Sequence, residues 1–404
     1  MGDAREVAPI VFVTLSLERG GTERHLAEIM PRLAARGWPV ALYCLAARGA
    51  MADEVEATGV EVIAPPIGGS AWFRGIGAPV RLAATATKLG WLLAARRPRI
   101  VHMFLPLPYL VGGPLSVLTA RPIRIMSRRN LADYQAKRPL ARRLEIALHG
   151  WMTAVLANSH RIGDELLAEG VAKDRLGVIH NGVDTARFGA PADKAALRAA
   201  LGIEADALVG VIVANLNPYK GHADLVRALA SVRERLPARW VLLAAGRDDG
   251  HGHELAALAQ SLGIAASMRF LGSRTDVPDL VRAADFALNV SHEEGFSNAV
   301  IEGMAAGLPM IVTGVGGNPE AVVDGETGLV VPPHDPAALG AAIAWLAANR
   351  ERAAEMGNAG ENRVRRHFTI EACVDRYDAL YRGLLAGEPA GMLVPHRSGR
   401  ERTS

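Results

Sequence analysis

The segment from Glu293 to Pro309 holds the residues best suited to chemistry in this chain of 404 residues. Glu294 and Glu302 stand eight positions apart, and Gly295 to Asn298 lie between them, where a buried strand is followed by a helix. Backbone N–H groups at a helix start bind phosphate and hydroxyl oxygens, and carboxylates accept hydrogen bonds from sugar hydroxyls. The spacing predicts a site for a ligand with both groups. The alternative is that Glu302 complements the helix dipole while Glu294 is solvated.

Lys220 occupies a similar junction earlier in the chain. It follows the apolar run 209–215 and precedes the helical pattern 221–235. An ammonium group at the end of a strand suits a diphosphate, because it offers a compact positive charge. The alternative is a surface lysine in a loop.

Gly20 and Gly21 form a third junction of the same kind, between a strand and a helix. Two glycines let the backbone approach a ligand, and the helix that follows offers free N–H groups to a phosphate. Thr22 and Glu23 could instead only cap that helix.

These motifs lie at the ends of strands in a chain that alternates between strand and helix. Apolar runs in the first half predict strands at 10–15, 40–44, 60–64, 100–104, 123–127 and 154–158, and helices at 22–36, 51–58, 79–95 and 140–152. The second half predicts strands at 209–215, 240–246, 268–271, 286–290 and 310–313, and helices at 221–235, 254–262, 277–284 and 298–306. The fold class is therefore α/β, with two Rossmann-like doubly wound parallel-sheet domains that face a central ligand-binding cleft.

The domain boundary is expected near 183–191, where His180 to Asp184 supply turn residues. We expect an N-terminal acceptor domain at 1–183, joined by a closing helix at about 369–386, and a C-terminal donor domain at 184–368. The tail 387–404 is rich in Gly, Pro, Arg and Ser, and we expect it to be disordered.

Composition favours a folded enzyme in a reducing compartment. Half of the residues are hydrophobic and 22% are charged. The two cysteines, Cys44 and Cys373, match neither a disulfide framework nor a metal site. No signal peptide is evident, and the uncharged stretch 100–120 contains too many Pro and Gly residues for a spanning helix. We expect a cytoplasmic protein that does not bind nucleic acid.

Charge is unevenly distributed between the halves. Residues 1–183 hold 23 Lys and Arg against 15 Asp and Glu, and no acidic residue occurs in 62–132. One predicted helix then carries basic residues beside an apolar stripe. The basic residues are Lys137, Arg138, Arg142 and Arg143, and the apolar residues are Leu144, Leu148 and Trp151. The pattern is typical of a helix at an anionic membrane surface. The alternative is that its apolar residues pack on the sheet.

Several motifs together resemble the family-4 retaining glycosyltransferases, which have the GT-B fold. The matching pieces, in chain order, are Gly-Gly-Thr-Glu-Arg-His (20–25), Ala-Asn-Ser (157–159), Ile-His-Asn-Gly-Val-Asp (179–184), Lys-Gly-His (220–222), Arg-Phe-Leu-Gly (269–272), Glu-Gly-Phe-Ser-Asn (294–298) with Glu302, Gly-Gly-Asn-Pro-Glu (316–320) and Gly-Glu-Thr-Gly-Leu (325–329). Their order and spacing are specific, and the resemblance covers nearly the whole chain.

The resemblance implies a nucleoside diphosphate sugar as donor, held mainly by the C-terminal domain. Glu302 would hold the ribose, Glu294 the donor sugar and Lys220 the diphosphate. The other implied donor contacts come from Gly20, Gly21, Asn215, Phe270, Gly295, Phe296, Ser297, Asn298, Ala299 and Val300. The implied catalytic residues are Glu294, Lys220 and Arg129.

Two positions depart from the family pattern. Asn215 stands where the family usually has an arginine, so one cation of the phosphate clamp is missing. Arg129 stands where a histidine is frequent. Its positive charge would serve the leaving phosphate or an anionic acceptor, and the alternative is a purely structural arginine. No pair of aspartates in a DxD arrangement is evident. We therefore expect no metal ion and no cofactor, with the leaving group stabilised by Lys220, amides and a helix dipole.

The resulting hypothesis is a retaining transferase that moves a sugar to a lipid-linked or glycan acceptor in the synthesis of an envelope polysaccharide or glycolipid. A sugar-nucleotide epimerase of the same fold is one alternative, since its donor site could look similar. An inactive donor-binding subunit is another. A nicotinamide dehydrogenase is disfavoured, because no Gly-x-Gly-x-x-Gly begins the first crossover.

Overall fold

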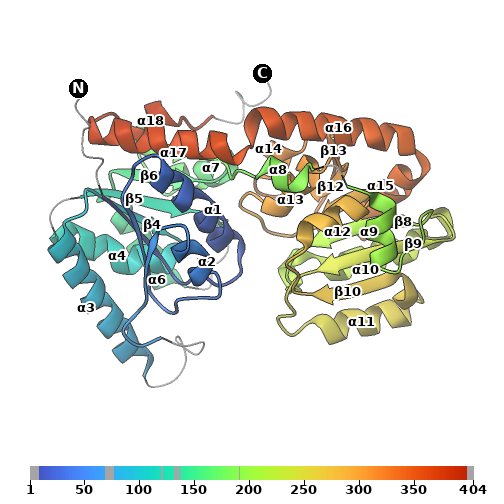
Figure 1. The fold of residues 1–404 in the computed structure, drawn as a ribbon, viewed down its shortest axis with the longest axis horizontal. Helices are drawn as coiled ribbons and strands as arrows, with labels where there is room; N and C mark the ends of the chain where they lie inside the picture. Colours follow the sequence, from blue (N-terminus) through green and yellow to red (C-terminus); the bar gives the residue numbers. More distant parts are fainter. Residues whose placement is uncertain are drawn as a thin grey trace. The chain divides into compact units, whose positions relative to one another are not determined.

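The chain forms two compact units, each built around one parallel sheet. The computed structural model describes residues 9–68, 77–119, 122–131, 135, 138–190 and 192–397. Unit 1 comprises Met1–Asn181 and Glu371–Ser404, and unit 2 comprises Gly182–Ile370. The chain therefore passes from unit 1 to unit 2 after Asn181 and returns after Ile370 (Figure 1).

Unit 1 contains a seven-stranded sheet in the order β3-β2-β1-β4-β5-β6-β7, and all neighbouring strands are parallel. Its strands are β1 (Ile10–Thr14), β2 (Val40–Cys44), β3 (Glu61–Ile63), β4 (Ile100–Phe104), β5 (Ile123–Arg128), β6 (Ala154–Ala157) and β7 (Leu176–Val178). Its helices are α1 (Gly21–Ala35), α2 (Ala52–Glu56), α3 (Ala78–Arg96), α4 (Pro106–Leu118), α6 (Pro139–His149), α7 (His160–Ala168), α17 (Ile370–Leu385) and α18 (Ala390–Leu393).

Unit 2 contains a six-stranded parallel sheet in the order β10-β9-β8-β11-β12-β13. Its strands are β8 (Leu208–Val213), β9 (Trp240–Ala245), β10 (Met268–Gly272), β11 (Phe286–Asn289), β12 (Met310–Thr313) and β13 (Gly328–Val331). Its helices are α8 (Thr185–Phe188), α9 (Lys194–Ala200), α10 (His222–Val232), α11 (Gly252–Ser261), α12 (Val277–Ala283), α13 (Asn298–Ala305), α14 (Asn318–Ala321), α15 (Pro336–Ala348) and α16 (Arg350–His367), with short 3-10 turns η1 (Pro218–Lys220), η2 (Arg233–Arg235) and η3 (Ala265–Ser267).

Burial on both faces explains why the strands of unit 2 are almost continuously apolar. Along β8, Val209 and Val211 belong to one core cluster, whereas Leu208 and Ile212 belong to the cluster on the opposite face. Helices cover both faces, so alternate residues of one strand are all buried. The α/β, doubly wound fold class is confirmed.

Both sheets reverse their strand order once. The reversal lies between β1 and β4 in unit 1 and between β8 and β11 in unit 2. In open parallel sheets, ligands bind outside the carboxyl ends of the strands at this switch point, because the connecting loops there diverge to opposite faces. The loops after β8 and β11 carry Lys220 and Glu294 respectively.

The helix α17 packs on unit 1 although it follows unit 2 in sequence (Figure 1). Trp38 Nε1 donates to Asp378 at 2.6 Å, and His25 Nε2 lies 3.2 Å from the Tyr377 hydroxyl. A second buried pair joins His102 Nδ1 to the Tyr381 hydroxyl at 2.8 Å.

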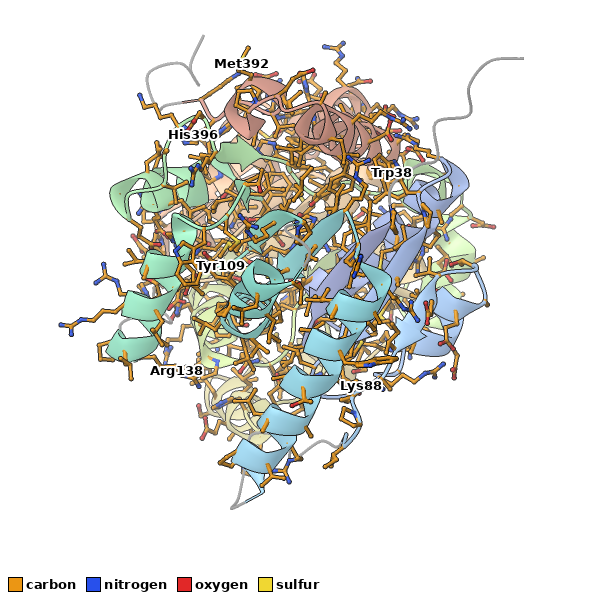
Figure 2. The ribbon with its side chains drawn as sticks, turned by 90° about the vertical axis from the view of Figure 1, so that its left-hand side faces the viewer. Trp38, Lys88, Tyr109, Arg138, Met392 and His396 are labelled. Atoms are coloured by element: carbon orange, nitrogen blue, oxygen red, sulfur yellow. The ribbon has the colours of Figure 1, made fainter. Side chains whose placement is uncertain are left out.

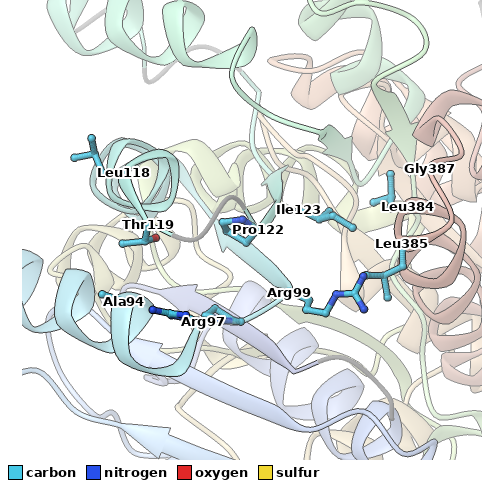
Figure 3. A pocket seen from close by; sticks show the side chains of 11 residues that line it. Ala94, Arg97, Arg99, Leu118, Thr119, Pro122, Ile123, Leu384, Leu385 and Gly387 are labelled. Carbon is cyan, nitrogen blue, oxygen red and sulfur yellow. The ribbon is translucent and has the colours of Figure 1, made fainter. Parts of the chain in front are cut away.

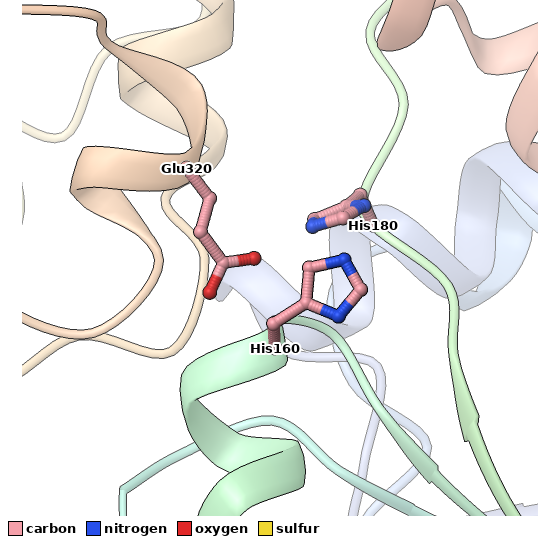
Figure 4. Close-up of side chains that lie close together, drawn as sticks. All are labelled: His160, His180 and Glu320. Atoms are coloured by element: carbon pink, nitrogen blue, oxygen red, sulfur yellow. The ribbon is translucent and has the colours of Figure 1, made fainter. Parts of the chain in front are cut away.

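The expectation of a disordered tail is wrong for residues 387–397. Val394 is 4% exposed, and its carbonyl oxygen accepts from Val178 N–H at the edge strand β7 at 2.9 Å. His396 Nε2 lies 3.1 Å from the carbonyl oxygen of His160. Figure 4 shows the His160 ring beside that of His180, with centroids 5.2 Å apart. Edge hydrogen bonds and one buried valine therefore order the tail despite its composition. Residues 398–404 lie outside the described residues.

The uncharged stretch 100–120 forms strand β4 and helix α4 as far as it is described. Gly112 of α4 lies so close to Met103 that a side chain there would crowd it. In the part of the chain that the structure describes, no helix is both long and apolar enough to cross a membrane.

Candidate donor-binding site

Lys220 and Glu294 meet at the switch point of the unit 2 sheet. The chain leaves β8 into a loop that ends in the turn η1, and it leaves β11 into the loop that precedes α13. Because β8 and β11 are neighbours, these two loops lie next to each other. Lys220 Nζ donates to Glu294 Oε1 at 2.6 Å, and the side chains are 18% and 12% exposed.

The environment of Lys220 keeps it charged. Burial alone would lower the pKa of its ammonium group, but the Glu294 carboxylate outweighs this effect and raises the pKa above the usual value. The pKa of the neighbouring His222 is shifted in the opposite direction. Burial, and then the charge of Lys220, lower it to about 4. The site thus presents one fixed cation beside a neutral imidazole.

Two further side chains hold Glu294 in place. Asn289 Nδ2 donates to Oε1 at 3.2 Å, and Ser291 Oγ donates to the same oxygen at 3.0 Å. Oε2 receives no hydrogen bond from the residues that the structure describes, and it is not fully buried. One carboxylate oxygen is therefore fixed by the protein, and the other is available to a ligand hydroxyl.

Glycines allow the backbone segments of this site to touch. Gly316 has a positive φ of 53°, and a Cβ there would overlap the carbonyl oxygen of Glu294. Gly317 N–H donates to the Gly295 carbonyl oxygen at 2.7 Å. Gly221 has φ 71°, and a Cβ there would overlap the Val290 carbonyl oxygen. Close backbone packing therefore fixes the Glu294 loop from two sides.

The N-terminus of α13 begins directly after this loop. Ser297 is its N-cap and makes no side-chain cap, because its hydroxyl accepts from Asn289 Nδ2 at 2.9 Å instead. Phe296 is 4% exposed and packs against Phe368, with ring centroids 5.3 Å apart. The Phe296 side chain is thus part of the core. Phe296 can therefore contribute to anion binding through its backbone and not through its ring. The same holds for the helix-start residues Asn298, Ala299 and Val300, whose contribution would be backbone N–H groups.

Glu302 lies inside α13 and is 4% exposed. It shares this eight-residue helix with Val300 and Ile301, which belong to the core of one sheet face. A carboxylate in such a position is held on a rigid element, in contrast to Glu294 in its loop.

The side chain of Asn215 links two loops at the carboxyl end of the unit 2 sheet. Its Oδ1 accepts from Arg247 N–H at 3.0 Å and so joins the loops after β8 and β9. Arg247 itself carries a half-exposed guanidinium, whose Nε donates to Asp249 Oδ1 at 2.6 Å. A cation is therefore present one strand away from the position where Asn215 replaces the family's arginine. Phe270, on the edge strand β10, is partly buried against the core.

The corresponding loop of unit 1 contains Gly20 and Gly21 at the start of α1. Gly20 is the N-cap of this helix and, as a glycine, provides no side-chain cap. Glu23 lies close enough that a side chain at Gly20 would overlap its carboxylate. A carboxylate beside a helix N-terminus competes with an incoming anion there.

Arg129 follows β5 and is 5% exposed. Its Nη2 donates to Asn181 Oδ1 at 2.6 Å, and burial lowers the pKa of its guanidinium. The side chain is thus tied to the last residue of unit 1 before the chain enters unit 2.

A separate hollow of about 860 Å³ opens in unit 1, lined by Arg97, Arg99, Leu118, Ile123 and Leu384 among others (Figure 3). These residues lie at the amino ends of β4 and β5 or at helix ends. That edge of the sheet is opposite to the one where doubly wound folds bind their ligands.

Sequence reasoning did not identify Asn289, Ser291, Arg247 and Asn318 as parts of the site. Asn318 Nδ2 donates to Asn289 Oδ1 at 3.1 Å and so orients the amide that holds Glu294. The available signal was a polar residue at the last position of a buried strand, as Asn289 is.

Two parallel sheets, each with one reversal of strand order and charged residues at the reversal, define a two-domain α/β protein of the type that binds nucleotides at strand ends. Comparison with known proteins specifies the class further. The family model described as Glycosyl transferases group 1 matches residues 193–363, and that described as Glycosyltransferase Family 4 matches residues 19–187.

Relatives agree along most of the chain. A D-inositol 3-phosphate glycosyltransferase from Streptomyces scabiei is 33% identical over 368 residues, which cover 85% of this chain and 82% of that protein. The solved structure of Anabaena HepE in complex with UDP-glucose has a TM-score of 0.81 at 22% identity, covering 94% of this chain and 100% of that one. Sucrose-phosphate synthase from Thermosynechococcus elongatus has a TM-score of 0.81 at 24% identity, with the same coverage.

The chain belongs to the family-4 glycosyltransferases and has their GT-B fold. It is an enzyme that transfers glycosyl groups.

Proposed function

We propose that this enzyme takes a sugar from a nucleoside diphosphate sugar and transfers it, with retention of configuration, to a lipid-linked or glycan acceptor at the inner face of the membrane. The observation that carries the proposal is the pair Lys220 and Glu294 at the carboxyl ends of β8 and β11. A diphosphate is negatively charged and can therefore displace the Glu294 carboxylate from Lys220. The released carboxylate can then accept hydrogen bonds from the sugar hydroxyls.

The remaining donor contacts follow from the local backbone. The amides of Gly295 to Val300 lie at or just before the start of α13, where partial positive charge favours phosphate oxygens. Glu302 would hold the ribose hydroxyls. Gly20 and Gly21 would approach the donor from unit 1, and Phe270 would contribute from β10.

The chemical step requires no protein nucleophile in this proposal. The acceptor hydroxyl attacks the anomeric carbon on the face from which the diphosphate leaves, and the departing phosphate oxygen takes the acceptor's proton. Lys220, the amides at α13 and the positive charge of Arg129 stabilise the phosphate in place of a metal ion. The proposal therefore includes catalysis without a metal.

The acceptor surface is proposed from helices α3, α4 and α6, which pack side by side in unit 1. Figure 2 shows this face, with Lys88 on α3, Tyr109 on α4 and Arg138 at the start of α6. Six large apolar side chains on or next to these helices are exposed, namely Val80, Trp91, Leu118, Leu140, Leu144 and Trp151.

Basic residues accompany these apolar side chains on α6. Arg138, Arg142 and Arg143 are exposed, whereas Leu148 of the same helix is 7% exposed and packs inward. Leu148 therefore follows the alternative stated above, in which apolar residues of this helix pack inward, whereas Leu144 and Trp151 are exposed. Lys137, which was expected to join the basic group, lies outside the described residues.

Exposed leucine and tryptophan beside arginine suit the boundary of an anionic bilayer, where each basic residue contributes about 1 kcal/mol. The relatives named as D-inositol 3-phosphate glycosyltransferases have an anionic phosphate in their acceptor's name, which supports testing anionic acceptors here as well.

Product analysis tests the proposal. Purified full-length enzyme is incubated with UDP- and GDP-sugars, with or without a lipid extract, and the sugar product is examined by mass spectrometry and by the configuration of its new linkage. Retained configuration in an acceptor-dependent product supports the proposal. An altered sugar nucleotide without an acceptor would indicate an epimerase, and nucleotide binding without any product an inactive subunit.

Vesicle co-sedimentation tests the membrane part separately. Binding should increase with anionic lipid, decrease with salt and weaken in the double variant Arg142→Glu, Arg143→Glu. The matched control changes Arg365 and Arg366, both exposed on α16 of unit 2, to glutamate. Equal binding of both double variants, or no binding of wild type, would favour a soluble acceptor.

A further inference from the structure

Three potential metal ligands from unit 2 converge next to the donor-binding loops. Asp224 lies on α10, His292 in the loop after β11, and His334 in the turn before α15. One ligand atom from each lies within 4.8 Å of those of the other two. His292 Nε2 lies 2.8 Å from Asp224 Oδ2, and the two imidazole rings have centroids 3.7 Å apart.

The local backbone holds each ligand independently. His292 N–H donates to the Tyr219 carbonyl oxygen at 2.7 Å, which joins its loop to the turn η1. Asp224 is in the first turn of α10. His334 adopts a positive φ of 60°, a backbone conformation that is uncommon for residues other than glycine. The turn places the His334 ring against that of His292, with centroids 3.7 Å apart.

We propose that Asp224, His292 and His334 bind a divalent transition metal ion, with Zn²⁺ as the best-matched species. Two imidazole nitrogens and one carboxylate oxygen form a ligand set that zinc accepts in tetrahedral sites, with the fourth position open to water. Mg²⁺ and Ca²⁺ prefer oxygen ligands throughout, so they suit this set poorly. This ion is separate from the metal-independent chemistry proposed above.

The surroundings permit entry of an ion. His334 is exposed, whereas Asp224 and His292 are 18% and 20% exposed, so the cluster opens to solvent on one side. The opposing charge is Arg227, whose Nη1 lies 3.4 Å from the other carboxylate oxygen of Asp224, Oδ1. That guanidinium is half-exposed and screened by water, and it leaves Oδ2 directed to the histidines.

A bound ion would join three segments that flank the donor site. Asp224 follows Lys220 by four residues, and His292 precedes Glu294 by two. Fixing both loops reduces the ordering that donor binding requires, so Zn²⁺ should strengthen donor binding. This second consequence rests on the proposed function, whereas the metal site itself does not.

Zinc binding to the untagged, EDTA-stripped full chain tests the site directly. We expect about one Zn²⁺ per chain by competition with a fluorescent chelator, and a higher Tm with Zn²⁺ than without. His334→Gly is the decisive variant, because it removes one ligand while glycine relaxes the positive φ and so preserves the fold. It should weaken zinc binding by about tenfold or more. His253→Ala, at an exposed histidine of α11, is the matched control and should bind as wild type does.

Two outcomes would overturn the proposal. One is no stoichiometric binding to the wild type, which would leave His292 and Asp224 as an ordinary hydrogen-bonded pair. The other is equal affinity of His334→Gly and wild type. Measuring the Kd of a nucleoside diphosphate with and without Zn²⁺ then tests the coupling. Zinc binding with no donor binding in either condition would count against the proposed function and not against the metal site.

Discussion

Lys220 Nζ, in the loop after β8, lies 2.6 Å from Glu294 Oε1, in the loop after the neighbouring strand β11. The two residues are 74 positions apart in sequence, and only the reversal of strand order brings their loops together. Without a ligand, the cation and the carboxylate neutralise each other. In the proposed function, a diphosphate sugar replaces this pair with two separate contacts.

Removing either member of this pair should reduce transfer strongly. We expect Lys220→Met and Glu294→Gln each to lower kcat/KM about ten- to a hundredfold, since hydrogen bonds to charged groups contribute about 1.5 to 3 kcal/mol. Circular dichroism should show an intact fold. Arg365→Ala, which removes an exposed pair with Glu361 on α16, should change neither property. Wild-type kcat/KM in both site variants would show that the donor binds elsewhere.

Activity should survive chelation. Lys220 and the amides at the start of α13 neutralise the leaving diphosphate in the proposed mechanism, so EDTA should leave kcat within about twofold of its original value. EDTA should lower the Tm only by removing the ion at the separate site of Asp224, and transfer in His334→Gly serves as the control for that effect. Complete loss of transfer with EDTA, restored by Mg²⁺ or Mn²⁺, would contradict metal independence.

Replacing Asn215 tests the alignment with the family's phosphate clamp. Asn215→Arg restores the usual cation and should tighten nucleoside diphosphate binding by about tenfold, if the guanidinium reaches the phosphate. Asn215→Ala removes only the hydrogen bond from Arg247 N–H and should leave the affinity nearly unchanged. Calorimetric titration measures both. Equal Kd values for arginine and alanine would mean that position 215 does not face the diphosphate.

Glu169 should make unit 1 sensitive to acid. It accepts hydrogen bonds from Arg128 and from His149 and is 6% exposed. Burial alone would raise its pKa, but the hydrogen bonds from His149 and Arg128 outweigh it and lower the pKa to about 2. The carboxyl group of a glutamate in an unfolded chain has a pKa of about 4.3.

Because the folded pKa of Glu169 is the lower one, its contribution is complete above the unfolded pKa and is lost as pH falls from about 5 toward 2. The loss is on the order of 3 kcal/mol. Urea unfolding of the wild type at pH 7, 5 and 3.5 should show this decline, and Glu169→Gln should reduce it. Parallel curves for both proteins would show that other carboxylates are responsible.

Most of the strands were predictable because parallel strands buried on both faces give short apolar runs, as in Val40–Cys44 and Met310–Thr313. The edge strands β7 and β13 were not anticipated. Helices such as α15, which is Ala-rich and buried along most of one side, show little alternation and were not anticipated. The order of the tail could not be predicted either. It depends on the edge of β7, which accepts Val394 only once the sheet has formed.

The sequence predicted where the main residues of the candidate site lie along the chain, but not the contacts between them. Glu294 and Lys220 stand at strand-to-helix junctions that sequence periodicity locates, and Glu302 lies inside the helix that follows Glu294. The hydrogen bonds from Asn289 and Ser291 to Glu294 depend on the register of β11, which one sequence does not give. The positive φ of His334 is likewise a property of the folded turn.

In the proposed function, the loops at the ends of β8 and β11 hold the donor. Calorimetric titration of a nucleoside diphosphate sugar into the full chain tests this most directly. UDP-glucose is the first donor to test, followed by GDP-sugars. We predict one binding site in the wild type, with a Kd that is about tenfold or more weaker in Lys220→Met and in Glu302→Gln and unchanged in Arg365→Ala. Equal affinity in all four proteins, or no binding of any donor to the wild type, would contradict the account.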